Sequence, residues 1–174
     1  NPKIIAAYQA AELIKDGQSL CIGGGGAGHA VPDKLMEALG KRFINTSTPR
    51  QIRVLHPCGI GENKYRGMNH LAHEGLVETV IGGFWGNAPS MGKLAMDNKI
   101  KGYNFPQGVL GHLMRSTAGN EKGLLKKTGL HTFADPRYEG GKVNEITKED
   151  LVELTKINGE EFLFYHTIPV DVAF

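Results

Sequence analysis

Apolar and polar positions follow two different periods along this chain. Short apolar runs predict buried strands at residues 19–22, 51–56, 77–81 and 100–103. Between them, apolar residues fall at helical spacing. Because proline favours the first turn of a helix, these helices are expected to begin at Pro32, Pro89 and Pro106. With a further helix over residues 4–14 and one or two helical turns within 67–75, the pattern predicts an α/β fold with an open, mostly parallel sheet flanked by helices.

The last third of the chain has a different pattern. Residues 130–133 predict a short strand, and residues 134–150 read as a polar loop. Two strand-like runs then flank Asn158-Gly159, a strong hairpin signal because both central positions of a type I′ turn need positive φ. Apolar residues alternate from 168 to 174, so the chain stops inside a strand pattern. We expect one domain over residues 1–174, with a C-terminal β-hairpin and an incomplete C-terminal end.

Glycine is concentrated where the first predicted strand ends. Five of the six residues 23–28 are glycine, and glycine costs backbone entropy unless the chain needs positive φ or a close approach. The loops at 82–88 and 104–108 also link a predicted strand to a helix begun by proline. Because exits from parallel strands lie on the same edge of a sheet, we expect the loops 23–31, 82–88 and 104–108 to converge on one crevice.

The glycine loop has three possible uses. Gly23, Gly25 and Gly28 fit the G-x-G-x-x-G spacing of a dinucleotide-binding module, but three residues separate Gly28 from the predicted helix and no acidic residue follows the second strand. A phosphate site like that of sugar-phosphate isomerases is the second use, although the loop contains no Lys or Arg. The third is to present backbone N–H groups to a developing oxyanion or a carboxylate.

Composition narrows the class of protein. The 174 residues carry a formal net charge of +2, with 40% hydrophobic and 22% charged residues, as is ordinary for a soluble globular domain. Lys and Arg are spread evenly, without the basic stripe of a nucleic-acid-binding protein. No apolar run approaches the ~20 residues of a membrane span. Cys21 and Cys58 form no CxxC pair, which predicts neither a disulfide framework nor a zinc site and makes the cytoplasm the default location.

Several other side chains could carry chemistry. His70, His73 and Glu74 could be metal ligands, but neither H-E-x-x-H nor its reverse is present, and surface or hydrogen-bonded histidines are the alternative. Cys58 follows a strand and could be a thiolate, yet no arrangement of His and Asp supports a triad, and a small buried cysteine is commoner. The aromatic pair at 84–85 belongs either to the core or to a wall of the crevice.

Gln107 follows the proline that begins the last predicted helix. If Pro106 takes the first helical position, Gln107 lies in the first turn with its amide near the crevice. An amide there can both donate and accept hydrogen bonds. A solvated glutamine at a helix start is the alternative interpretation.

Longer motifs stand out along nearly the whole chain. They are AAELIKDG, GGGGAGHAVPDKL, HLAHEGL, GGFWGNAPSMGKLAMDNKIKGYNFPQGVLGHLMR, and FADPRYEGGKVNEITKEDLVEL followed by EFLFY. Together they resemble the family I coenzyme A transferases. Within that family they are similar to the short-chain acyl-CoA:acetate or propionate transferases, in which two related halves are fused.

The resemblance implies a fold of the CoA-transferase and sugar-isomerase type and a ping-pong reaction in which a glutamate attacks an acyl-CoA thioester. It implies acyl-CoA, coenzyme A and a short-chain carboxylic acid as substrates, with no permanently bound cofactor. The family's glycine loop lines the active site and matches Gly24, Gly25, Gly26, Ala27 and Gly28. The glutamine of its P-Q-G motif, close to the catalytic carboxylate, matches Gln107, and the glycine after it matches Gly108.

The family's nucleophilic glutamate lies in the second half, whereas the motifs found here match the first half. Glu62 and Glu74 superficially resemble the nucleophile, but each lies in a segment that matches the first half. We therefore expect this chain to be the alpha half of an oligomeric enzyme of short-chain fatty acid metabolism. It should need a second, beta half that carries the catalytic glutamate, and it should be inactive alone.

Overall fold

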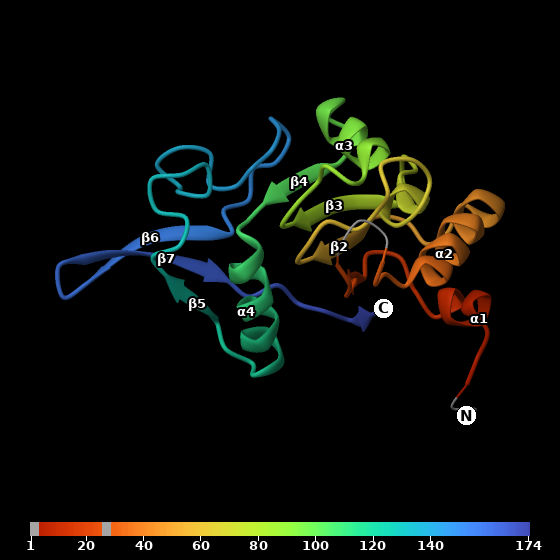
Figure 1. The fold of residues 1–174 in the computed structure, drawn as a ribbon, viewed down its shortest axis with the longest axis horizontal. Coiled ribbons are helices and arrows are strands. Elements are labelled where there is room, and N and C mark those ends of the chain that lie inside the picture. The colour runs from red at the N-terminus through yellow and green to blue at the C-terminus, as the bar shows by residue number, and fades with distance from the viewer. Residues whose placement is uncertain (1–3, 26–28) are drawn as a thin grey trace.

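A five-stranded parallel sheet forms the centre of the fold (Figure 1). The computed structural model describes residues 4–25 and 29–174. The strand order is β4-β3-β2-β1-β8, and all neighbouring strands are parallel. The strands are β1 (Ser19–Cys21), β2 (Ile52–His56), β3 (Val77–Gly82), β4 (Lys101–Asn104) and β8 (Val172–Ala173). The predicted open α/β sheet is confirmed.

Helices cover both faces of the sheet because successive strand residues point to opposite sides. In β2, Val54 belongs to the core on one face and Leu55 to the core on the other. The first face is covered by α1 (Ala7–Glu12), α2 (Asp33–Thr46), the 3₁₀ helix η1 (Met68–Leu71) and α3 (Pro89–Met96), and the second by α4 (Gln107–Ala118). Within the described ranges, no helix is long and apolar enough to cross a membrane.

Both ends of the chain are less regular than the sequence predicts. The first helix begins only at Ala7, because Ile4 is 91% exposed and the buried part of the pattern is limited to Ala11 and Ile14. The terminal strand is limited to β8. Pro169 interrupts the alternating pattern before it and has no N–H to donate to a ladder.

A small antiparallel sheet lies beyond α4 (Figure 1). Its strands are β5 (Gly123–Lys126), β6 (Val152–Ile157) and β7 (Glu160–His166), in the order β5-β7-β6. Asn158 and Gly159 both have positive φ, 51° and 84°, so the predicted hairpin is confirmed. Leu163 and Tyr165 of β7 are fully buried and belong to the same core as the buried residues of α4.

The strand predicted at 130–133 is wrong, and β5 was not predicted. Residues 130–133 form turns, because Gly129 and His131 both have positive φ (101° and 61°) and break an extended backbone. The strand next to β7 is instead Gly123–Lys126, whose pairing partner lies some forty residues later along the chain. Only that distant partner makes the segment a strand.

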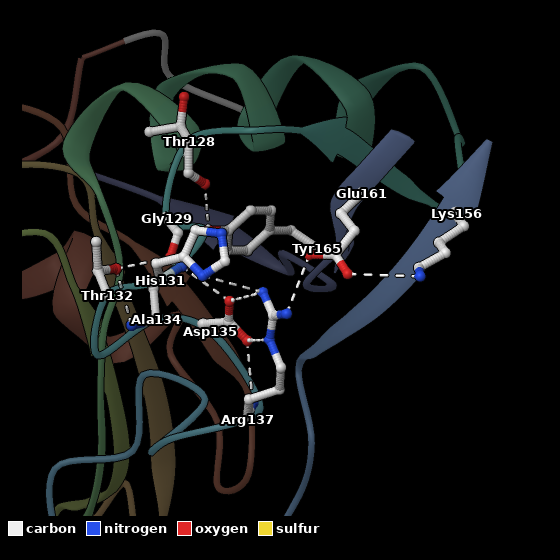
Figure 2. Close-up of polar contacts among 10 residues, drawn as sticks. All are labelled: Thr128, Gly129, His131, Thr132, Ala134, Asp135, Arg137, Lys156, Glu161 and Tyr165. Carbon is white, nitrogen blue, oxygen red and sulfur yellow. Dashed lines mark hydrogen bonds and ion pairs between the residues drawn. The ribbon is translucent and has the colours of Figure 1, made fainter. Parts of the chain in front are cut away.

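A buried carboxylate organises the loop between β5 and β6 (Figure 2). Asp135 is fully buried and accepts hydrogen bonds from Arg137 Nε (3.0 Å) and Nη2 (2.7 Å) and from the backbone N–H groups of His131 and Arg137. These hydrogen bonds, chiefly those from the Arg137 side chain, hold the pKa of Asp135 well below its usual range. Arg137 Nη1 also donates to Glu161 Oε2 on β7 at 3.0 Å. The loop is thereby fastened to the small sheet.

Candidate active site

The loops that leave β2 and β3 pack directly against the start of α4. A Cβ atom added at Gly83 would overlap the carbonyl oxygen of Pro57 and would come within 2.7 Å of Gln107 Cγ. The backbone N–H of Gly83 donates to the carbonyl of His56 at 3.1 Å. Only a glycine permits this approach, so residue 83 brings the exits of β2 and β3 against Gln107.

The exit of β2 also contacts the glycine loop. The thiol of Cys58 donates to the carbonyl oxygen of Gly24 at 2.8 Å, and a Cβ atom at Gly25 would lie 3.1 Å from Cys58 Sγ. The described parts of the three loops therefore do converge at one edge of the sheet. The sequence did not predict that the β2 exit lies between them, since this follows from the strand order.

Cys58 is half-buried, whereas a small buried cysteine was the commoner expectation. The turn that contains Cys58 packs against a buried histidine. His56 is 2% exposed, and its Nδ1 lies 2.8 Å from the carbonyl oxygen of Cys58. Burial lowers the pKa of His56 and keeps the ring neutral at pH 7. This support for the β2 exit was missed by sequence reasoning, because an isolated histidine at a strand end carries no distinctive signal.

The N-terminus of α4 presents hydrogen-bond donors at the same edge. Pro106 is the N-cap, whereas the sequence predicted it at the first helical position. Gln107 is therefore the first helical residue. The first intrahelical bond runs from Leu110 N–H to the Pro106 carbonyl (3.1 Å), so the preceding first-turn N–H groups have no acceptor within the helix. Gln107 and Gly108 are both exposed. This helix end, with its partial positive charge, can stabilise negative charge.

The described part of the glycine loop offers fewer unengaged N–H donors than its sequence suggests. Gly24 has φ of 124°, and a Cβ atom there would overlap the carbonyl oxygen of Ala30. The N–H of Gly23 donates to the Phe174 carbonyl and that of Gly25 to the Ala30 carbonyl. Among the described residues, the Gly24 N–H has no acceptor. Three further candidates, Gly26, Ala27 and Gly28, lie outside the described residues.

The three residues considered as metal ligands lie away from this edge or are engaged elsewhere. His73 stacks on Phe43 with ring centroids 6.0 Å apart, and His70 Nε2 lies 3.3 Å from Asp33 Oδ1. Glu74 pairs with Lys99 just before β3 begins, at the opposite edge of the sheet. In residues 4–25 and 29–174 no three His, Cys, Asp or Glu side chains are grouped as metal ligands.

Replacing Gly83 by alanine is expected to disturb both the fold and the site. The new methyl group overlaps a backbone carbonyl that cannot move freely, so we expect a loss of about 1–3 kcal/mol in unfolding free energy and a displaced Gln107. Thermal unfolding of this chain measures the first effect, and a crystal structure of the variant measures the second. Gly111→Ala is the matched control, because a Cβ atom there meets no atom within 4 Å. Equal behaviour of both variants would contradict the packing described.

This chain is similar in sequence to a known protein family and to several of its members. The family model "Coenzyme A transferase" matches residues 4–174. The acetate CoA-transferase YdiF of Escherichia coli K12 is 41% identical over 171 residues, which are 98% of this chain and 32% of YdiF. The caffeate CoA-transferase of Acetobacterium woodii is 40% identical over the same shares. The chain thus spans about a third of the length of these relatives.

A solved structure and a shorter relative are also similar to this chain. The crystal structure of the YdiF apoenzyme from Escherichia coli O157:H7 superposes with a TM-score of 0.95 at 40% identity, over 99% of this chain and 35% of that one. The alpha subunit of the acetoacetyl-CoA:acetate/butyrate CoA transferase of Clostridium acetobutylicum is 29% identical over 99% of this chain and 69% of its own length. The chain belongs to the coenzyme A transferase family.

Proposed function

We propose that this chain forms the alpha half of an enzyme that moves coenzyme A between a short-chain acyl-CoA and a carboxylic acid. The observation that carries the proposal is the packing of Gln107 and the α4 N-terminus against Gly83 and Pro57 at the strand-exit edge. This edge offers hydrogen-bond donors for a reacting carbonyl. The family resemblance implies that the nucleophilic glutamate comes from a second half.

The chemistry follows from a carboxylate nucleophile. A glutamate of the second half attacks the thioester carbonyl carbon and forms a tetrahedral intermediate. The C–S bond then breaks, which releases the CoA thiolate and leaves an acyl-glutamyl anhydride. The thiolate then attacks the glutamyl carbonyl and releases the first acid, which leaves a glutamyl-CoA thioester. An acceptor carboxylate takes CoA by the reverse of these steps. Coenzyme A is thus a substrate, and no permanently bound cofactor is needed.

This chain acts on the charge that develops during these steps. Each tetrahedral intermediate carries a negative oxygen, and a preorganised donor at such an oxygen contributes on the order of 3–4 kcal/mol. We assign this role to the Gln107 side-chain amide, the first-turn N–H groups up to Gly108, and the glycine loop from Gly24 to Gly28. Within the described part of that loop, Gly24 offers the unengaged N–H.

The names of the relatives support the proposed function. Two of them act on carboxylic acids as different as acetate and caffeate, and the Clostridium relative is an alpha subunit. Membership of this family disfavours the dinucleotide-binding and sugar-phosphate alternatives. We place the enzyme in the cytoplasm, where the free thiols of Cys21 and Cys58 would stay reduced.

The chain should exchange CoA only when the second half is supplied. The test measures transfer of CoA from acetyl-CoA to propionate by this chain alone and by this chain combined with the matching second half. We expect exchange in the combination and none from the chain alone, because the nucleophile is missing. Turnover by residues 1–174 alone, or no turnover by the combination, would overturn the proposal.

A further inference from the structure

A cavity lies beside the strand-exit edge, at the β4 side of the sheet. Its volume is about 420 Å³, and its walls include Phe84, Trp85, Gly92, Met96, Asn104 and Val143. We propose that this cavity, here called the tail pocket, holds the uncharged tail of the acceptor acid. The inference rests on the proposed function and adds the kind of acid that the site selects.

Position connects the tail pocket to the reacting groups. Phe84 follows Gly83, which packs on Gln107, and the Phe84 ring would lie 2.6 Å from a Cβ atom at Gly59 in the β2 exit. Asn104 ends β4, three residues before Gln107. Phe84 therefore stands between the crevice and the tail pocket. An acid whose carboxylate lies in the crevice can extend its tail past this ring.

The lining chemistry indicates an apolar tail. The walls are aromatic, aliphatic and thioether groups with no charged side chain, so the carboxylate end of an acid is not favoured inside. The one polar side chain in the lining is that of Asn104. Its Oδ1 is shielded from solvent and has no hydrogen-bond partner among the described residues. A buried carbonyl oxygen without a partner is unfavourable. A hydroxyl group on the bound tail, with a small rotation of the amide, would provide one.

The walls are held in place before any ligand binds. Trp85 Nε1 donates to the Tyr103 carbonyl oxygen at 3.1 Å. Val143 N–H donates to the Gly102 carbonyl oxygen at 3.0 Å, and Asn104 N–H donates to the Gly141 carbonyl oxygen at 2.7 Å. A preformed cavity of this size is within the range of small-molecule sites. It is far larger than acetate needs, which favours acids with an aryl or long alkyl tail.

Trp85 supplies a direct readout because it is the single tryptophan of the chain. The test titrates this chain with 3-phenylpropionate, 3-(4-hydroxyphenyl)propionate and acetate, and follows tryptophan emission excited at the red edge of its absorption. We expect saturable changes with both aryl acids and none with acetate. The hydroxylated acid should bind about tenfold more tightly, and Asn104→Leu should remove this preference. No response to either aryl acid would overturn the inference.

Gly92 allows the tail pocket to be filled without disturbing the fold. It lies inside α3, and a Cβ atom there meets no atom within 4 Å, so Gly92→Leu should place its side chain in the cavity. We expect this variant to lose the emission response, while the matched Gly111→Leu on the exposed face of α4 keeps it. In the intact enzyme, Gly92→Leu should shift the ratio of kcat/KM for acetate over 3-phenylpropionate at least tenfold towards acetate.

The two readouts separate this inference from the proposed function. If the intact enzyme exchanges no CoA but the aryl acids still bind and Gly92→Leu still blocks them, the tail pocket stands and the proposed function falls. If exchange occurs but Gly92→Leu leaves the acid preference unchanged, the tail pocket falls alone. Weakened association with the second half in Gly92→Leu, with unchanged preference, would show that the cavity is an interface and would also overturn the inference.

Discussion

Gln107→Leu is expected to lower kcat of the intact transferase by about 10²- to 10³-fold, the usual effect of removing one oxyanion donor. Leucine keeps a carbon at the Cγ position that packs on Gly83 but removes the amide. Because the donor acts on charge that develops in the transition state, kcat should fall much more than KM changes. Steady-state kinetics with acetyl-CoA and propionate measures both constants.

A structural defect would give a different result. Gln107 is exposed, so its replacement should leave the melting temperature of this chain nearly unchanged. Gln107→Glu is a second control, since it keeps the shape but places a negative charge near the developing oxyanion, and it should be at least as impaired as Gln107→Leu. Retention of kcat within twofold in Gln107→Leu would contradict the assigned role.

Asp135→Asn is expected to destabilise the chain by roughly 2–4 kcal/mol. The Arg137 guanidinium loses its buried carboxylate partner, and the backbone N–H groups of His131 and Arg137 lose their charged acceptor. For a domain of this size the melting temperature should fall by about 5–10 °C. Glu160→Gln is the matched control. It removes a carboxylate from the exposed ion pair with Lys127, where little stability is at stake.

The contribution of Asp135 should also depend on pH in a defined direction. Its folded-state pKa lies below the unfolded value of about 3.9. The stabilisation is therefore fully present above pH ~4 and is lost as pH falls through the folded pKa. Melting temperatures of wild type and Asp135→Asn should converge on acidification below pH 4. A constant difference between pH 7 and pH 3 would show that the ion pair is not responsible.

The main sheet was predictable because its signals are local. The strands β1, β2 and β3 are mostly buried and read as apolar runs. A proline marks the start of Pro89–Met96 and precedes two other helices. The loop between β5 and β6 was not predictable in the same way. Residues 130–133 have strand-like side chains, but Asp135 binds the His131 N–H and stabilises turns. This local hydrogen bond and the positive φ of Gly129 and His131 decide the structure of the segment.

The candidate site could be predicted only in part. The proline-glutamine pair and the glycine loop are visible as motifs, and parallel strand exits must share an edge. That the β2 exit lies between them depends on strand order, which long-range pairing sets. The tail pocket is further from prediction. Phe84, Met96 and Val143 lie within longer motifs of the sequence, but nothing in those motifs indicates that the three side chains line one cavity.

The central claim is that this chain supplies donors and the second half supplies the nucleophile. Peptide mapping by mass spectrometry, after the intact enzyme has been incubated with acetyl-CoA, tests it most directly because it locates the covalent CoA thioester. We expect the adduct on a glutamate of the second half and none on the 18 Asp and Glu residues of this chain. A CoA adduct on any carboxylate within residues 1–174, such as Glu62, would contradict the account.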